Sequence, residues 1–142
     1  MPEITIEIPI VPKAQARARS RIAGKGGRQF VQVYTSAAQR NEQDNFKALL
    51  YRQLPAGFQP IQGAVKMWIY ARLPIPKCSK KQMERYLSLE IPHVARPDVD
   101  NLAKHVKDCC KGAVWHDDRQ VTKLVVAKAY HPQPGWEIRL EW

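Results

Sequence analysis

Residues 96–126 read RPDVDNLAKHVKDCCKGAVWHDDRQVTKLVV. Pro97 biases the residue before it toward extended backbone, so this stretch begins outside a helix. A helix is predicted from about Asn101 to Lys111, with Gly112 placed to end it and with an apolar side formed by Leu102, Val106, Cys109 and Cys110. The valine-rich run 121–130 alternates as a strand does. A helix followed by a strand indicates an α/β fold.

The segments on either side extend this pattern. Apolar and polar residues alternate over 3–10, 65–72 and 136–142, which predicts three further strands. Capping-box patterns that begin at Ser36 and Ser79 predict helices over about 36–53 and 79–89. A Pro-Gly turn at 134–135 predicts that strands 121–130 and 136–142 form a hairpin. No repeat or shift in composition divides the chain, so we predict one domain, 1–142, with a mixed sheet and flanking helices.

The charge balance is the unusual property of the composition. The 142 residues include 23 Lys and Arg and 13 Asp and Glu, a formal net charge of +10. Such an excess favours an anionic partner, of which nucleic acid is the commonest, although solubility or a membrane surface also explains it. No stretch approaches the roughly 18 apolar residues of a membrane span, and the N-terminus lacks a signal-peptide pattern. We therefore expect a cytoplasmic protein without a membrane partner.

Residues 13–28 concentrate positive charge. They contain no acidic residue and three glycines, which predicts a basic, flexible arm or loop. Its charges could contact nucleic acid, or the segment could be an ordinary solvated loop. The candidate nucleic-acid-binding residues are Lys13, Arg17, Arg19, Arg21, Lys25 and Arg28, with Arg96 further along the chain.

The predicted strand 65–72 has one apolar face and one face that is cationic and aromatic. The second face carries Lys66, Trp68, Tyr70 and Arg72. Aromatic and basic side chains can stack on bases and bind phosphates. Trp68 and Tyr70 could equally lie under a helix or in a dimer interface, so both interpretations stay open.

Acidic residues cluster in one short region of this basic protein. Five of the thirteen acids lie between Asp98 and Asp118. Asp98 and Asp100 are two residues apart in predicted extended backbone, so their carboxylates should point to one side. Together with Asp118 or Asp117 they could hold Mg²⁺, which prefers oxygen ligands. Lys104 follows Asp100 by four residues, on the same helical face, where its ammonium could bind a phosphate oxygen.

Each of these positions also has a structural explanation, as a helix cap, a turn or a solvated ion pair. The three cysteines are odd in number and predict reduced thiols, and a zinc site built from His105, Cys109 and His116 would lack a fourth ligand. No glycine-rich loop indicates an organic cofactor. The residue types alone leave both a metal-dependent nuclease and a nucleic-acid-binding module without catalysis as interpretations.

Two motifs occur in a specific order. Residues 96–104 contain D-x-D-N-L-x-K, and after a helix of roughly a dozen residues the segment 112–121 contains W-x-D-D-x-Q-V. This combination resembles the core signature of the RusA family of Holliday junction resolvases. The signature covers about a quarter of the chain. A weaker likeness extends to the N-terminal strand and the Arg-rich segment, whereas residues 73–92 do not align.

The resemblance implies a homodimeric, Mg²⁺-dependent endodeoxyribonuclease of mixed α/β fold, encoded by a bacterium or phage, with Mn²⁺ able to substitute. Its substrate would be the four-way DNA junction, resolved by paired symmetric nicks in recombination and repair. A less selective nuclease acting on flaps, forks or RNA is the alternative.

Carried over to this sequence, the resemblance makes Asp98, Asp100 and Asp118 catalytic metal ligands, Lys104 the essential lysine and Asp117 a less certain further ligand. Some relatives have a basic run before the Asp-x-Asp motif, where this chain has Arg96 alone. Junction contacts are therefore expected on 13–28.

Overall fold

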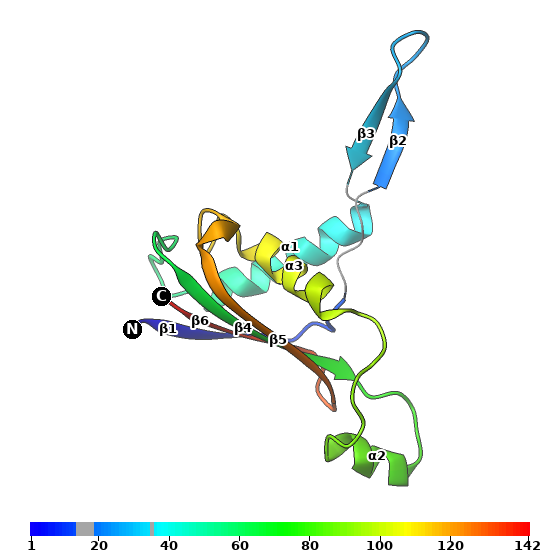
Figure 1. The fold of residues 1–142 in the computed structure, drawn as a ribbon, viewed down its shortest axis with the longest axis vertical. Helices are drawn as coiled ribbons and strands as arrows, with labels where there is room; N and C mark the ends of the chain where they lie inside the picture. Colours follow the sequence, from blue (N-terminus) through cyan, green and yellow to red (C-terminus); the bar gives the residue numbers. More distant parts are fainter. Residues whose placement is uncertain (14–18, 35) are drawn as a thin grey trace.

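The computed structural model describes residues 1–13, 19–34 and 36–142. Its main sheet has four strands in the order β1-β6-β4-β5, and β2 pairs separately with β3. Helices α1 and α3 lie on the same side of the main sheet, while α2 lies beyond one end of it (Figure 1). The elements in chain order are β1 (Glu3–Ile8), β2 (Arg19–Ala23), β3 (Phe30–Tyr34), α1 (Ala37–Gln53), β4 (Val65–Pro74), α2 (Lys80–Leu87), α3 (Val99–Cys110), the 3₁₀ turn η1 (Asp118–Gln120), β5 (Val121–His131) and β6 (Gly135–Glu141).

The sheet is mixed, as the sequence predicts. β6 runs antiparallel to both β1 and β4, whereas β4 and β5 are parallel. The two N-terminal serine caps are also confirmed: Ser36 Oγ accepts from Gln39 N at 3.3 Å, and Ser79 Oγ accepts from Gln82 N at 3.2 Å. Gly112 follows α3 with a φ of 85°, a conformation that glycine adopts without steric cost. No described helix is both long and apolar enough to cross a membrane.

The core lies between the sheet and helices α1 and α3. β4 alternates strictly, with every second side chain buried from Val65 to Leu73. Each large apolar side chain that is fully buried contributes about 1.5–3 kcal/mol to folding. The largest buried side chains of the remaining elements are Ile6, Ile8, Phe46, Leu50, Leu102, Trp115, Trp136, Ile138 and Leu140. This core fixes α3 against the sheet, and α3 carries most of the candidate site.

The predicted hairpin between β5 and β6 is wrong. β4 lies between these two strands and pairs with both of them. Residues 132–134 therefore cross over the end of β4. They connect two strands that lie about 10 Å apart, which is twice the spacing between neighbouring strands. The Pro-Gly pattern marks a reversal correctly, but it carries no information about a strand that enters the gap from a much earlier part of the chain.

The prediction of a basic, flexible arm or loop over 13–28 did not foresee that residues 19–23 form strand β2. β2 and β3 form an antiparallel hairpin whose register runs from Arg19 opposite Tyr34 to Ala23 opposite Phe30. The glycine-rich tract 24–27 belongs to its turn. A Cβ at Gly24 would lie 2.0 Å from the carbonyl oxygen of Arg28, so this position requires glycine. The hairpin extends away from the rest of the molecule (Figure 1).

Trp68 lies on the sheet face opposite the helices. Its neighbours there are Lys123, whose Nζ is 5.2 Å from the ring centroid, and Arg139, whose guanidinium carbon is 4.6 Å from it. Both are cation–π contacts. The alternative that Trp68 packs under a helix is therefore wrong for the described residues, while contact with nucleic acid or with a second copy stays a prediction.

Candidate active site

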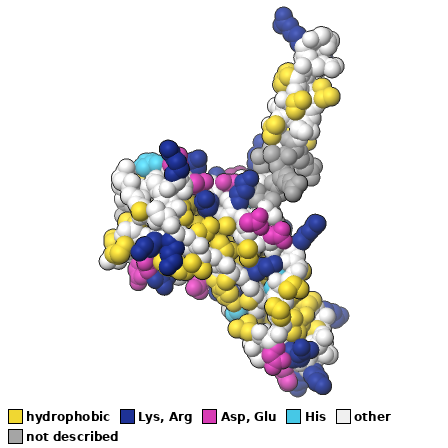
Figure 2. Space-filling model, in the orientation of Figure 1, with side chains coloured by type: hydrophobic (Ala, Val, Ile, Leu, Met, Phe, Trp, Pro, Cys, Tyr) yellow, Lys and Arg dark blue, Asp and Glu magenta, His cyan; other side chains and the backbone are white. Residues whose placement is uncertain are grey.

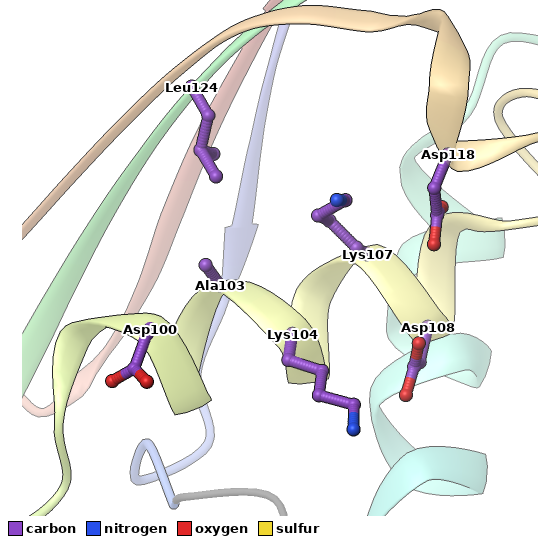
Figure 3. A pocket seen from close by; sticks show the side chains of 7 residues that line it. All are labelled: Asp100, Ala103, Lys104, Lys107, Asp108, Asp118 and Leu124. Carbon is purple, nitrogen blue, oxygen red and sulfur yellow. The ribbon is translucent and has the colours of Figure 1, made fainter.

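A cleft of about 380 Å³ opens between α3 and the start of β5. Figure 3 shows its side chains, with Asp100 toward one end and Asp108 and Asp118 toward the other. The lining residues are Asp100, Ala103, Lys104, Lys107, Asp108, Asp118 and Leu124. The structure thus brings three of the predicted site residues, Asp100, Lys104 and Asp118, to one cleft.

Helix α3 supplies five of the seven lining residues because it is amphipathic. Its apolar side is buried in the core, so the opposite side faces solvent. Asp100, Lys104 and Asp108 follow one another at intervals of four and share a face. The sequence-based prediction used this spacing for Lys104 alone. Counting four more residues from Lys104 along the helix would have predicted Asp108 on the same face.

The helix begins earlier than predicted, at Val99 rather than Asn101. Asp98 is its N-cap, with extended backbone at φ −76° and ψ 150°, and Asp100 lies in the first helical turn. The expectation that both carboxylates lie side by side on extended backbone is therefore wrong. Asp98 is exposed and makes no capping hydrogen bond with its side chain, and it does not line the cleft.

Asp118 reaches the cleft from η1, and neighbouring side chains hold it there. Its Oδ1 accepts a hydrogen bond of 3.0 Å from the indole Nε1 of Trp115, whose ring is fully buried. Gln120 Oε1 accepts from the backbone N–H groups of His116 and Asp117 at 2.8 and 3.0 Å. Gln120 Nε2 donates to the carbonyls of Ile61 and Gly63 at 2.6 and 2.9 Å. This glutamine therefore joins the turn before β5 to the segment before β4.

Asp117 has a different environment from Asp118. It caps η1, and its Oδ1 accepts from the backbone N and the Nε of Arg119 at 2.9 and 3.1 Å. These hydrogen bonds lower the pKa of its carboxyl. Asp117 does not line the cleft. The structure thus places this less certain metal ligand in a structural cap.

Lys128 lies outside the cleft lining and holds the segment before Asp98, a role that sequence reasoning missed. Its Nζ donates to the carbonyl oxygens of Ala95 and Pro97, at 2.6 and 2.8 Å. These bonds attach the segment before Asp98 to β5. The sequence contains a signal for this role. Lys128 lies in a valine-rich strand, at a position where the alternation predicts an inward-facing side chain.

The cleft contains the donor atoms that a hard cation prefers, namely carboxylate oxygens. Among residues 1–13, 19–34 and 36–142, no three His, Cys, Asp or Glu side chains converge on a common metal position. Mg²⁺ is commonly held by one or two carboxylates together with substrate phosphates and water. The donor set of the cleft fits such an ion. The carboxylates that could hold it are Asp100 at one end of the cleft and Asp118, with Asp108, at the other.

The alternative zinc site is not assembled. His105 is buried, stacks on Trp136 with centroids 5.6 Å apart, and lies with Nε2 4.0 Å from the Sγ of Cys109. Burial lowers the pKa of His105 and raises that of Cys109 to about 12, which keeps both groups neutral. His116 instead contacts Gln62, with Nε2 atoms 2.9 Å apart. His105 and Cys109 are therefore part of the core.

The candidate nucleic-acid-binding residues that the structure describes lie after β1, on the β2–β3 hairpin and before α3. Lys25, Arg28 and Arg96 are exposed, whereas Lys13 Nζ lies 3.8 Å from the Glu42 carboxylate. Arg21 is on the hairpin beside Gln32. Arg17 and the side chain of Arg19 lie outside the described residues.

An open cleft with three carboxylates and two lysines, on an α/β domain of net charge +10, suits the class of enzymes that act on nucleic acids. The comparison with protein families agrees with this class. Residues 9–141 match the family described as Endodeoxyribonuclease RusA, and the chain belongs to that family of nucleases.

One relative comes from Bacillus subtilis (strain 168) and has the name "Uncharacterized protein YqaN". It is 36% identical over 83 residues, which are 56% of this chain and 58% of the relative. The chain thus matches less than two thirds of that protein.

Proposed function

We propose that the chain is a Mg²⁺-dependent endodeoxyribonuclease that resolves four-way DNA junctions by paired symmetric nicks. The observation that carries the proposal is the cleft that Asp100 and Lys104 of α3 line together with Asp118 of η1. Membership of the RusA family supports the reaction and the substrate. The Bacillus relative supports a bacterial or phage setting. Family membership supports a role in recombination and repair, which we propose takes place in the cytoplasm.

The roles of the residues follow from their chemistry. Asp100 and Asp118 would supply carboxylates for Mg²⁺ from the two ends of the cleft, and Asp98, at the N-cap and outside the cleft lining, is proposed as a further ligand. When bound, this ion lowers the pKa of its water and offsets charge on the scissile phosphate. Lys104 binds a non-bridging phosphate oxygen and stabilises the charge that develops there. Trp115 orients one oxygen of Asp118, and Lys128 holds the segment that leads to Asp98.

The rest of the molecule holds the polyanion. The cleft itself contributes Lys104 and Lys107, and exposed basic residues continue on the β2–β3 hairpin. A four-way junction has two equivalent scissile phosphates, so we propose a homodimer with two-fold symmetry and two such clefts. Mass measurement in solution tests the dimer directly.

The decisive experiment is cleavage of an end-labelled four-way junction and of a linear duplex, each in Mg²⁺ and in EDTA. Asp98→Asn and Asp100→Asn should lose cleavage and keep junction binding, because each removes a carboxylate that would hold the ion and also removes repulsion of phosphate. Asp44→Asn is the matched control, since Asp44 is exposed on α1 and outside the cleft.

The outcomes separate three functions. Paired nicks in the junction that need both Mg²⁺ and the two aspartates support the resolvase. Equal cutting of the duplex would indicate a less selective nuclease. Tight junction binding without cutting, under every metal tested, would instead indicate a binding module and refute the proposal.

A further inference from the structure

A second cleft, of about 620 Å³, lies at the base of the β2–β3 hairpin. It opens between one face of the hairpin and the first turns of α1, and it shares no residue with the candidate active site. Its lining residues are Arg21, Gln32, Tyr34, Ala37 and Arg40. Its volume is in the range of about 300–1,000 Å³ that is typical of small-molecule sites.

The hairpin has two different faces. Directly opposed residues of an antiparallel pair project to the same side. Arg21 and Gln32 are such a pair and line the cleft, whereas the neighbouring pairs, Ser20 with Val33 and Ile22 with Val31, are mostly aliphatic and project to the other side. Figure 2 shows apolar side chains along the hairpin and basic ones at its tip. The face turned toward α1 is the one that carries Arg21, Gln32 and Tyr34.

The polar side chains of this cleft are already arranged with respect to one another. Arg21 Nε donates to Gln32 Oε1 at 3.0 Å, and the Arg21 guanidinium carbon lies 5.3 Å from the centroid of the Tyr34 ring. The terminal nitrogens of a guanidinium in this geometry still carry N–H groups that can reach an oxyanion. Tyr34 is 36% exposed, so part of the residue is accessible.

The cleft is also strongly cationic. Two arginines line it and no acidic residue does, and the first turn of α1 contains no acid either. The N-terminal end of a helix carries partial positive charge, so Arg40, near that end, is electrostatically unfavourable in the absence of an anion. An anionic ligand would relieve this unfavourable arrangement.

We propose that this cleft binds an unpaired nucleotide of branched DNA, with its phosphate between Arg21 and Arg40 and its base stacked on Tyr34. DNA as the ligand rests on the proposed function. The unpaired state follows from the accessible aromatic residue, because stacking requires a base whose face is free. Single-stranded ends and gaps supply such bases, as does a branch point where a base pair opens, whereas the interior of a fully paired linear duplex does not. The cleft thus adds selectivity for branched DNA at a distance from the cutting site.

The test is binding, measured by fluorescence anisotropy in EDTA at several salt concentrations. The probes are a labelled oligothymidylate, a four-way junction and a linear duplex. Arg40→Gln should weaken oligothymidylate binding about 5- to 10-fold and reduce the slope of log K against log salt by about one. Arg52→Gln, at the other end of the same helix, removes the same charge outside the cleft and should change neither.

The aromatic contact has its own variants. Tyr34→Ala should weaken oligothymidylate and junction binding about 5-fold or more and leave duplex binding unchanged, since one base stack is lost. Tyr34→Phe keeps the ring and should restore the affinity. Arg40→Gln removes an unfavourable charge near the helix N-terminus, so its thermal unfolding should not be lowered, and a binding loss is then not a folding defect.

Two results would overturn the inference: equal binding by Arg40→Gln and Arg52→Gln, or binding by Tyr34→Phe that is as weak as binding by Tyr34→Ala. Junction cleavage by the wild-type chain in Mg²⁺ is scored separately. If cleavage fails while the binding pattern holds, the proposed function fails and this inference stands. If cleavage succeeds and the binding pattern is absent, only this inference fails.

Discussion

Gln120 holds the turn that carries Asp118. Its amide makes four hydrogen bonds, two as acceptor from the turn and two as donor to the segment before β4. A hydrogen bond contributes about 0.5–1.5 kcal/mol net. Gln120 is half-buried, so we expect Gln120→Ala to lower the free energy of unfolding by about 2–4 kcal/mol.

The assay is urea unfolding, followed by fluorescence of the buried tryptophans, together with junction cleavage. Gln62→Ala is the matched control, because Gln62 is an exposed glutamine next to the same turn and should change stability by less than about 0.5 kcal/mol. Gln120→Glu separates the two pairs of bonds. It keeps the acceptor and replaces the donor by an oxygen that faces the carbonyls of Ile61 and Gly63.

This variant should be less stable than wild type at neutral pH and should recover as pH falls, because a protonated carboxyl can donate again. Cleavage by Gln120→Ala should fall even in conditions where the protein is fully folded. A loss of stability below about 0.5 kcal/mol would refute the reasoning. Unchanged cleavage by the folded variant would show that the turn holds Asp118 without this glutamine.

Three further predictions concern single contacts. Trp115→Phe removes the indole N–H from the carboxylate in the cleft and should reduce cleavage about 10-fold or more with little change in junction affinity, as measured by single-turnover kinetics. Lys128→Met should lower the free energy of unfolding by about 1–3 kcal/mol and should also reduce cleavage. Lys128→Arg should keep much of the stability and of the cleavage. Equal losses in the two variants would contradict a hydrogen-bonding role. Native protein should react with a thiol reagent at Cys78 alone, since Cys109, with a pKa of about 12, and Cys110 are buried; mass spectrometry of the labelled peptides would show any reaction of the other two.

The local features of the fold could be predicted from the sequence. Ser36 and Ser79 indicate where their helices begin because a cap depends on residues three positions away. The alternation of β4 is visible for the same reason. Pairing between distant segments could not be predicted: nothing in 121–142 indicates that β4 enters between β5 and β6.

The candidate site divides in the same way. Spacing along one helix predicts that Asp100 and Lys104 share a face, and it extends to Asp108. The predicted start of α3 is two residues late. The structure places Asp100 in the first helical turn rather than in extended backbone. The contacts of Gln120 span 57 and 59 residues and those of Lys128 span 31 and 33, and no local pattern encodes them.

The order of strands in the sheet also determines when the protein can fold during its synthesis. β1 and β4 are not neighbours in the sheet, because β6 lies between them and pairs with both. β6 follows every other described element in the chain, so the ribosome has released β1, β4 and α3 before the strand that joins them exists. Pairing across such sequence separations is slow. The sheet that supports the candidate cleft is therefore complete only after translation has passed residue 141.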